Sequence, residues 1–437
     1  MNNEAKKINV FWFRRDLRLN DNTALYHALA GEFPVLAVFI FDKNILNNLD
    51  DKKDRRICFI YKTLEQINAE LQKHHSSLYV LNDTPIKAFE KICSDFEVNE
   101  VFTNHDYEPY AIERDAEIKS FLEGKNISFH TYKDQVIFGR SEVMKPNGQP
   151  YTIFTPYSKT WKEKLKKEGV KLFASEKKIS NLLKTDPFHF PSLKDIGFEK
   201  INVDFPRLNI SEKLISNYEA TRNIPAIDGT SFASVYLRFG TVSVRELVML
   251  ANKLNEKWLN ELILREFFMM ILFHFPYVVN ENFNRKYDDL KWRNNEKEFE
   301  LWCKGETGYP IVDAGIRQLN ETGWMHNRVR MIVAGFLCKD LLIDWRWGEA
   351  YFAEKLLDYE LSSNNGNWQW AAGTGSDAAP YFRIFNPHEQ IKKFDPKLIY
   401  IKKWLKDFRP GYLPEIVNHE FARKRAIQAY KKALEDK

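Results

Sequence analysis

The sequence lacks the signatures of several common classes of protein. No run approaches the roughly 18 consecutive apolar residues of a membrane-spanning helix, so no contact with a membrane is expected. The opening residues, MNNEAKKINVFWF, lack the long apolar stretch of a signal peptide, and we expect a cytoplasmic protein. The net charge of +5, from 65 basic and 60 acidic side chains, permits a polyanionic partner through a local basic patch but does not require one.

Cysteine is scarce and is not arranged for metal binding. The chain has four cysteines, none of them in a CxxC pair and none with the spacing of a zinc site. They are Cys58, Cys93, Cys303 and Cys338, and all lie in apolar or helical contexts. We therefore predict buried free thiols in a reducing compartment and no metal site.

The glycine-rich loops that bind phosphates in many α/β proteins are missing as well. Short apolar runs over 8–13, 34–42, 77–83, 100–106 and 127–133 alternate with stretches of helical period, which predicts a doubly wound parallel sheet. No GxGxxG follows the first run and no GxxxxGK[ST] occurs anywhere. An ordinary dinucleotide or triphosphate site is not supported, although the crevice at the carboxyl ends of the strands remains a ligand position.

The alternation of strand and helix signals ends after residue 135, and two different patterns follow it. Residues 184–208 carry three prolines and little periodicity, which is typical of a linker. From Ser211 onward nearly every segment has apolar residues three and four apart, which predicts about a dozen helices. We therefore expect an α/β domain over 1–135, an interdomain linker over 136–210 and an all-helical domain over 211–437.

What the chain has in unusual density is tryptophan. Five of its 11 tryptophans lie between Trp324 and Pro387, beside amides, arginines and acids. Indoles among fixed polar groups indicate a site for a large planar molecule that exchanges electrons. Trp292, Trp345 and Trp368 are oxidisable side chains that would relay electrons if they formed a row, but each taken singly is more often a structural core residue.

Several polar groups have both a functional and a plain structural interpretation. DGTSFAS at 228–234, near an expected helix start, suits either a phosphate site or a helix N-cap. Arg330 and Asp358 are a candidate ion pair. Asn364-Asn365-Gly366 offers an amide to a heterocycle edge, yet the spacing alone favours a turn.

The motifs together resemble one family. FWFRRDLRLNDN at 11–22, FTPYSKTW at 154–161, KGETGYPIVDAGIRQLNETGWMHNR at 304–328 and WQWAAGTGSDAAPYFRIFNP at 368–387 are similar to segments of the DNA photolyases and cryptochromes, in the same order and over nearly the whole chain. The resemblance implies FAD held in a U shape in the helical domain. It also implies blue-light-driven transfer of an electron from reduced FAD to a flipped-out pyrimidine dimer.

Within the family the chain looks most like the class I cyclobutane pyrimidine dimer photolyases, because of Asn327, Met331, Asn364 and Trp370. By position, the resemblance implies an electron relay of Trp292, Trp345 and Trp368, and catalytic roles for Glu261 and Asn364. The FAD contacts that it implies are Tyr218, Thr230, Ser231, Phe232, Ala233, Ser234, Arg265, Arg330, Asp358, Tyr359, Glu360 and Asn364. The implied contacts to the lesion and to DNA are Arg222, Glu261, Leu264, Arg265, Asn327, Arg328, Met331 and Trp370.

Two departures from the family pattern leave alternatives open. Leu264 stands where the repair enzymes usually carry a lesion-stacking tryptophan, and plant cryptochromes also have leucine there, so a cryptochrome-like photoreceptor is the alternative to a repair enzyme. Tyr110 and Ala111 stand where folate-binding members carry Asn-Glu. A second, antenna chromophore would therefore be folate, deazaflavin or flavin, or be absent. The expected partner is damaged DNA, and the expected state is a monomer.

Overall fold

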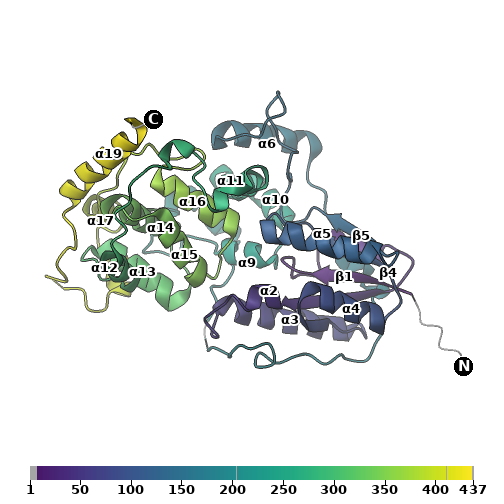
Figure 1. The fold of residues 1–437 in the computed structure, drawn as a ribbon. Coiled ribbons are helices and arrows are strands. Elements are labelled where there is room, and N and C mark those ends of the chain that lie inside the picture. The colour runs from purple at the N-terminus through teal and green to yellow at the C-terminus, as the bar shows by residue number, and fades with distance from the viewer. Residues whose placement is uncertain (1–6, 203, 410, 436–437) are drawn as a thin grey trace, which may run out of the picture. The chain divides into compact units, whose positions relative to one another are not determined.

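The computed structural model describes residues 7–202, 204–409 and 411–435, and the chain divides into two compact units (Figure 1). The first unit takes in the chain up to Gly139 together with Lys164–Leu208 and Phe232–Leu250. The second takes in Arg140–Glu163, Asn209–Ser231 and Ala251 onward. Residues 136–210, which the sequence assigns to a linker, carry the helix α6 (Phe154–Glu168) and the short 3-10 helix η1 (Ser175–Asn181).

The first unit is built on a parallel sheet of five strands. They are β1 (Ile8–Phe13), β2 (Val35–Asp42), β3 (Tyr79–Asp83), β4 (Val98–Asn104) and β5 (Ser128–Tyr132), in the order β3-β2-β1-β4-β5. Val10 on the central strand faces Leu36 on one side and Val101 on the other. All residues of β1 and β2 are buried, which explains their continuous apolar sequence. The predicted doubly wound parallel sheet is confirmed.

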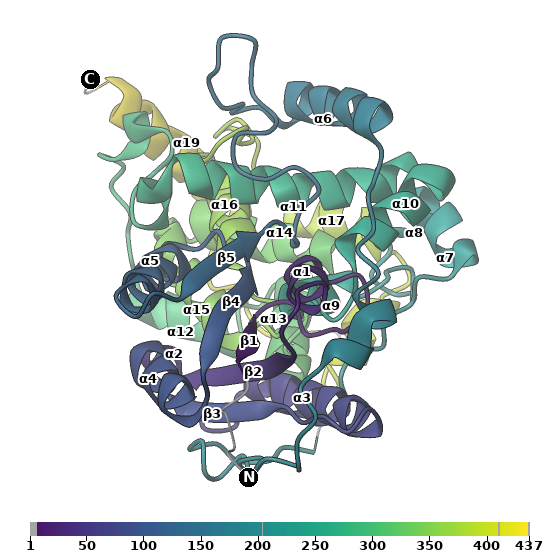
Figure 2. The same cartoon turned by 90° about the vertical axis from the view of Figure 1, so that its right-hand side faces the viewer.

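Helices cover both faces of this sheet. α1 (Thr23–Leu29) and α3 (Arg55–Lys73) lie on one face, and α4 (Pro85–Asp95) and α5 (Pro109–Glu123) on the other (Figure 2). α2 (Lys43–Leu46) is a single turn after β2. Asn22 caps α1 by accepting a hydrogen bond from the backbone of Leu25, and a proline in the first turn starts both α4 and α5. These local signals explain why the helix starts were readable from the sequence.

A buried cluster of charges ties distant segments of the first unit together. The carboxylate of Asp134 accepts hydrogen bonds from Arg18 (2.7 Å), from Arg245 (2.7 Å) and from the backbone of Thr23 (3.1 Å). Arg245 also binds Asp21 at 2.7 Å. Burial alone would raise the pKa of Asp134, but the two arginines hold that pKa well below its usual range. The cluster links the start of α1, the segment after β5 and the helix α10 (Val244–Leu254).

Replacing Asp134 with Ala should therefore lower the free energy of unfolding by about 3–5 kcal/mol, because two buried guanidinium groups lose their counter-charge. The contribution of Asp134 is present above the pKa of an unfolded aspartate, about 3.9, and is lost as the pH falls through its lower folded value. Urea unfolding followed by circular dichroism at pH 7 checks this, with exposed Asp186→Ala as the control. Equal stability of the two variants would contradict it.

The second unit is helical, as predicted. Its 3-10 segments are η2 (Pro276–Val279) and η3 (Arg285–Tyr287). It also contains most of α6. Its remaining helices are α7 (Glu212–Ser216), α8 (Tyr218–Thr221), α11 (Glu256–His274), α12 (Glu296–Lys304), α13 (Pro310–Thr322), α14 (Asn327–Gly335), the π-helical η4 (Phe336–Asp340), α15 (Trp345–Lys355), α16 (Leu361–Ala372), α17 (Pro387–Phe394), α18 (Ile399–Trp404) and α19 (His419–Glu435). α9 (Ala233–Phe239) and most of α10 belong to the first unit.

One expectation about local structure is wrong. The spacing of Asn364-Asn365-Gly366 favours a turn, but these residues form the second turn of α16. Their amides find partners outside the helix, since Asn365 donates a 2.8 Å hydrogen bond to the carbonyl of Val278. Gly366 is where the ring of Phe268 approaches, and a Cβ there would lie 2.2 Å from that ring. Tertiary contacts therefore outweigh the turn preference of the three residues.

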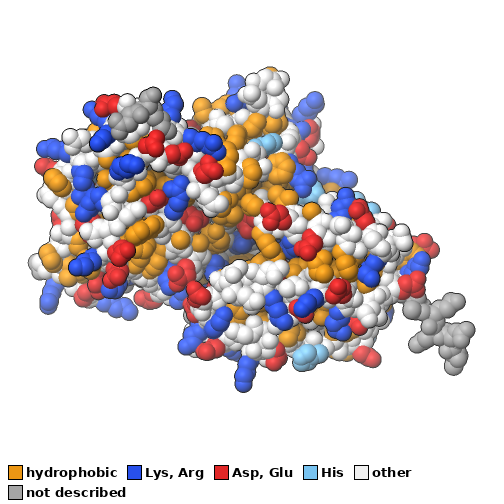
Figure 3. Space-filling model, in the orientation of Figure 1, with side chains coloured by type: hydrophobic (Ala, Val, Ile, Leu, Met, Phe, Trp, Pro, Cys, Tyr) orange, Lys and Arg blue, Asp and Glu red, His pale blue; other side chains and the backbone are white. Residues whose placement is uncertain are grey.

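The aromatic residues of the second unit form one large core. Trp302, Trp345 and Trp368 are buried in it, and Trp292 packs against it partly exposed. All four cysteines are free, with Cys58 and Cys338 buried and the other two half-buried. No helix among the described residues is long and apolar enough to cross a membrane, and no group of three metal-ligating side chains occurs among them. Basic and acidic side chains are interspersed on the face drawn in Figure 3, in keeping with the small net charge.

Candidate functional site

A cavity in the second unit is lined by α14, α15, α16 and the turn between α15 and α16. Its empty space is about 600 Å³ including its open mouth. Its lining combines fixed polar groups with aromatic rings, and includes Asn327, Arg330, Met331, Phe352, Asp358, Tyr359, Glu360, Asn364, Trp368 and Trp370. Nine of the residues singled out from the sequence thus meet at one place, although they come from two helices, α14 and α16, and the turn that precedes α16.

Arg330 and Asp358 form the ion pair expected from the sequence. The Nη2 of Arg330 lies 2.9 and 3.1 Å from the two carboxylate oxygens of Asp358. The Nε of the same guanidinium donates to the carbonyl of Met325 at 2.7 Å, so the side chain is held at both ends. Asp358 is 8 % exposed, and a carboxylate this buried needs such a partner. The pair gives the cavity one rigid, charged edge.

Asn364 is held in one orientation by Glu349. Its Nδ2 donates to the Oε1 of Glu349 at 2.8 Å and to the backbone carbonyl of Glu349 at 3.1 Å. Because the amide nitrogen is engaged, the Oδ1 of Asn364 is the atom left to accept a hydrogen bond from a molecule in the cavity. Burial raises the pKa of Glu349, whereas its hydrogen bond from Asn364 opposes that rise. The sequence reasoning missed Glu349, which has no distinguishing sequence signal.

His326 precedes α14 and caps it. Its Nδ1 accepts a hydrogen bond from the backbone N–H of Arg328 at 3.1 Å, so the proton of the neutral ring is on Nε2. That Nε2 is buried and has no partner among the described residues. Burial, followed by the nearby charges of Arg330 and Arg328, lowers the pKa of His326 to about 4. The ring is therefore neutral at physiological pH.

His326 should make stability depend on pH. Below pH 6.5 the unfolded chain binds a proton that the folded chain does not bind until about pH 4, so the free energy of unfolding should fall over this window. The contribution of this group amounts to about 3 kcal/mol at most. His326→Asn keeps a capping side chain and should flatten this part of the profile, measured by urea unfolding between pH 7 and 4. Exposed His388→Asn is the control, and parallel profiles for all three proteins would contradict the assignment.

Trp368 lies at the inner end of the cavity, against α15. Its ring is 4.9 Å from that of Phe352 and 6.2 Å from that of Trp302, with both contacts edge-to-face. A Cβ on Gly348 would lie 2.1 Å from Cη2 of Trp368, so α15 and α16 approach this closely only because residue 348 has no side chain. A glycine inside a helix costs about 1 kcal/mol relative to alanine, and its presence in DWRWGEAYF was a readable signal that the sequence reasoning did not use.

Gly348→Ala should consequently displace the indole of Trp368 and lower the free energy of unfolding by about 1–3 kcal/mol, the usual cost of overpacking. The measurement is chemical unfolding together with the tryptophan emission of the folded protein. Glu354→Ala, on the exposed side of the same helix, is the matched control. An unchanged stability and emission for Gly348→Ala would show that the indole is not clamped there.

The other two tryptophans of the expected relay belong to the same core. Trp345 begins α15, is 1 % exposed and donates from Nε1 to Asn282 at 2.9 Å. Trp292 is half-buried and meets the ring of Tyr430 edge-on at 6.2 Å. Trp368 lines the cavity, Trp345 is buried in the same hydrophobic core, and Trp292 packs against that core and is partly exposed. Trp302, which contacts Trp368, was not singled out from the sequence.

The residues expected to contact the lesion fall into two groups. Asn327, Met331 and Trp370 line the cavity. Glu261 instead pairs with Arg222 at 2.6 Å, and neither of them, nor Leu264, is among the residues lining the cavity. Burial raises the pKa of Glu261 and the charge of Arg222 opposes that rise. Tyr218 joins this second group because the guanidinium of Arg222 lies 5.3 Å from its ring centroid.

Two further arginines are fixed by neighbours. Arg265 pairs with Glu360 at 2.9 Å, which connects α11 to the N-cap of α16. Arg328 donates to the amide oxygen of Asn223 and lies 4.4 Å from the ring centroid of Phe394. Within the segment 228–234, Thr230 and Ser231 fall in the second unit, whereas Phe232, Ala233 and Ser234 fall in the first. Phe232 is the N-cap of α9, in a left-handed conformation and without a side-chain cap.

Comparisons with known proteins place the chain in one family. Residues 9–176 match the family model of DNA photolyase, and residues 258–410 match that of the FAD binding domain of DNA photolyase. The deoxyribodipyrimidine photo-lyase of Escherichia coli is 36% identical, with 98% of this chain and 99% of the relative covered. That of Alkalihalophilus pseudofirmus is 37% identical, with 95% and 90% covered.

Solved structures of photolyases have the same fold as this chain. A bacterial class III photolyase from Agrobacterium tumefaciens superposes with a TM-score of 0.86 at 29% identity, covering 99% of both chains. An archaeal photolyase from Sulfolobus tokodaii with two FAD molecules superposes with a TM-score of 0.82 at 33% identity, covering 97% of this chain and 99% of the other. The fold and the site therefore define a flavoenzyme, and the chain belongs to the DNA photolyase family, with FAD as its cofactor.

Proposed function

We propose that this protein repairs cyclobutane pyrimidine dimers in DNA, using blue light and reduced FAD. The observation that carries the proposal is the composition of the cavity in the second unit. Polar groups that suit a flavin (Arg330, Asp358, Asn364) and side chains that suit a pyrimidine dimer (Asn327, Met331, Trp370) line the same space.

The residues at the rigid edge of the cavity fit the isoalloxazine ring of FAD. The Oδ1 of Asn364 is an oriented acceptor for a ring N–H, and the paired guanidinium of Arg330 stabilises negative charge on the reduced ring. Bound there, reduced FAD supplies the electron that light transfers to the lesion. The protein contributes the orientation, the exclusion of water and the placement of charge.

We assign Glu261 to the lesion as a hydrogen-bond donor. Its raised pKa lets its carboxyl keep a proton to a higher pH than an exposed glutamate does. A protonated carboxyl can donate to a carbonyl oxygen of a pyrimidine, where negative charge develops once an electron arrives. Arg222, which contacts Glu261, would bind a backbone phosphate at the edge of the same region.

We assign Trp292, Trp345 and Trp368 to the supply of electrons. Their placement supports this assignment, because Trp345 and Trp368 share one buried core and half-buried Trp292, packed against that core, would be the point where an electron enters. The close packing of Trp368 against Gly348 would hold its indole in one place beside a ring bound in the cavity.

The test of this function is illumination of the reduced, FAD-loaded protein with an oligonucleotide carrying one thymine dimer. The expected result is loss of the dimer under blue light and not in the dark, measured by chromatography of the product. A duplex carrying a (6-4) photoproduct is the matched control and should persist. Photoreduction of the protein without loss of dimers would contradict the proposal and favour a cryptochrome-like photoreceptor, the alternative that Leu264 supports.

Leu264 itself gives a quantitative prediction. Restoring the aromatic side chain in Leu264→Trp should tighten binding of dimer-containing DNA roughly ten- to hundredfold, because one stacking face is worth about 1–3 kcal/mol. Fluorescence anisotropy with damaged and undamaged duplexes measures this change, and the undamaged duplex should bind both proteins alike. Equal affinity of the two proteins for damaged DNA would place Leu264 outside the lesion pocket.

We propose that a second chromophore of this protein would be a flavin, as in the archaeal photolyase from Sulfolobus tokodaii, which contains two FAD molecules. Tyr110 and Ala111 stand where folate-binding members carry Asn-Glu, which disfavours a folate. The hydroxyl of Tyr110 instead donates a 2.5 Å hydrogen bond to Asp42 at the carboxyl end of β2.

A further inference from the structure

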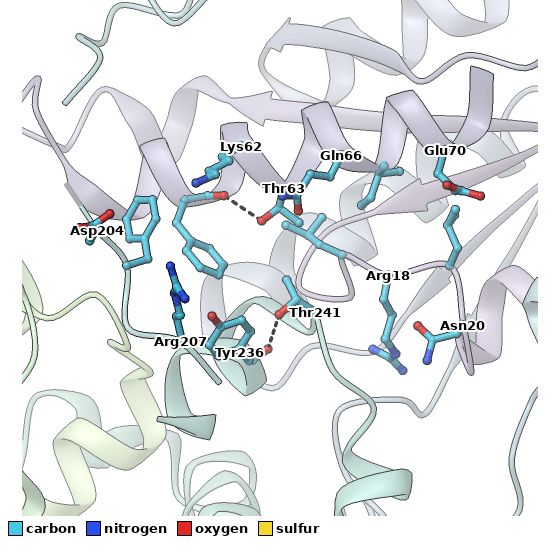
Figure 4. Close-up of a pocket in the computed structure, with 15 residues that line it drawn as sticks. Arg18, Asn20, Lys62, Thr63, Gln66, Glu70, Asp204, Arg207, Tyr236 and Thr241 are labelled. Carbon is cyan, nitrogen blue, oxygen red and sulfur yellow. Dashed lines mark hydrogen bonds between the residues drawn. The ribbon is translucent and has the colours of Figure 1, made fainter. Parts of the chain in front are cut away.

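A second cavity lies entirely within the first unit and does not involve the flavin site. It is bounded by α3, by the turn at residues 17–20, by residues 204–207 and by Tyr236 and Thr241 (Figure 4). Its volume is about 480 Å³. Sites for small molecules usually have volumes of about 300–1,000 Å³, so this space is large enough for a compact ligand.

The floor of the cavity is a group of aromatic rings centred on Phe59. The ring of Phe59 is 5.1 Å from that of Phe205 and 5.8 Å from that of Tyr236, and it stacks on Phe239 at 4.9 Å. The hydroxyl of Tyr236 donates to the carbonyl of Pro206 at 2.9 Å, which fixes the segment 204–207 against α9. The rings of Phe59, Phe205 and Tyr236 are thus held in place and give the cavity an aromatic wall against which a planar molecule can pack.

Two cations stand at one end of this floor. Lys62 lies above Phe205, with its ammonium 6.0 Å from the ring centroid, and Figure 4 draws the guanidinium of Arg207 next to Tyr236. Neither cation has an ion-pair partner among the described residues. Asp204 is the one carboxylate at this end, so two positive charges stand against one negative charge.

The opposite end of the cavity is lined by two amides, one carboxylate and one guanidinium. Asn20 and Gln66 present amides to the cavity, and Glu70 lies beyond them on α3. Arg18 is 5 % exposed, and its Nε–H is buried without a partner among the described residues. A buried donor of this kind is unfavourable unless something accepts a hydrogen bond from it. The two ends therefore differ in chemistry along one aromatic floor.

We propose that this cavity binds a mononucleotide. Its heterocycle would stack on the rings around Phe59, its phosphate would lie between Lys62 and Arg207, and its polar ring edge would face Gln66 and Asn20. Arginine and lysine are the residues that bind phosphate in proteins, and aromatic faces accept any base. The site would bind free nucleotide independently of the flavin and of the DNA lesion.

Isothermal titration of the FAD-loaded protein in the dark with 5′-AMP tests the proposal. We expect one molecule bound per chain, with adenosine and inorganic phosphate each binding at least tenfold more weakly than 5′-AMP. A parallel titration with FMN shows which heterocycle the cavity prefers. If FMN and 5′-AMP bind with similar affinity, the site accepts nucleotides in general. If FMN binds more tightly than 5′-AMP, the site is specific for a flavin nucleotide. Absence of binding by both nucleotides at millimolar concentration would overturn the proposal.

Variants locate the binding. The double change Lys62→Met and Arg207→Met should weaken nucleotide binding at least tenfold, because both phosphate partners are lost. Both side chains are exposed, so the variant should fold normally. Lys87→Met, at an exposed position on α4, is the matched control and should bind like the parent. Dimer repair should be unchanged in all variants, and a double variant that binds nucleotide as tightly as the parent would remove the site from this cavity.

Discussion

The close approach of α15 and α16 is the constraint on which the rest of the site depends. Gly348 allows Trp368 to lie against α15, and the same pairing of helices brings Glu349 within hydrogen-bonding distance of Asn364. One helix–helix contact therefore sets the position of an indole and the orientation of an amide at once. If the helices separated, the cavity would lose both the electron-rich wall and the oriented acceptor.

The charged groups of the site are paired before any ligand arrives. Arg330 with Asp358 and Arg265 with Glu360 each join two segments of the second unit. Such preorganisation matters in a light-driven reaction, because no slow rearrangement of charge is needed after the electron moves. Each ion pair also joins two segments that are far apart in the sequence, so the same side chains stabilise the fold and place charge at the site.

Much of the fold was readable from the sequence. The five strands lie within about two residues of their predicted positions, because buried parallel strands are continuous apolar runs and their helices carry local caps. The helical unit was predicted in kind but less well in detail. The helix α14 passes directly into a π-helical segment at Phe336–Asp340, and a turn after Lys355 separates α15 from α16. Such local breaks depend on packing against neighbouring helices, which periodicity does not encode.

Those residues of the candidate site that belong to family motifs, or whose residue type suggests a role, could be predicted from the sequence. Arg330 with Asp358 and the cavity-lining set of Asn327, Met331 and Trp370 were anticipated. Glu349, Gly348 and Trp302 were not, because each acts through a partner on another helix. The most direct test of the account is a crystal structure of the FAD-loaded protein. The account predicts the isoalloxazine ring in the cavity of α14, α15 and α16, within hydrogen-bonding distance of the Oδ1 of Asn364. A ring bound elsewhere, or an Asn364 amide turned away from it, would contradict the account.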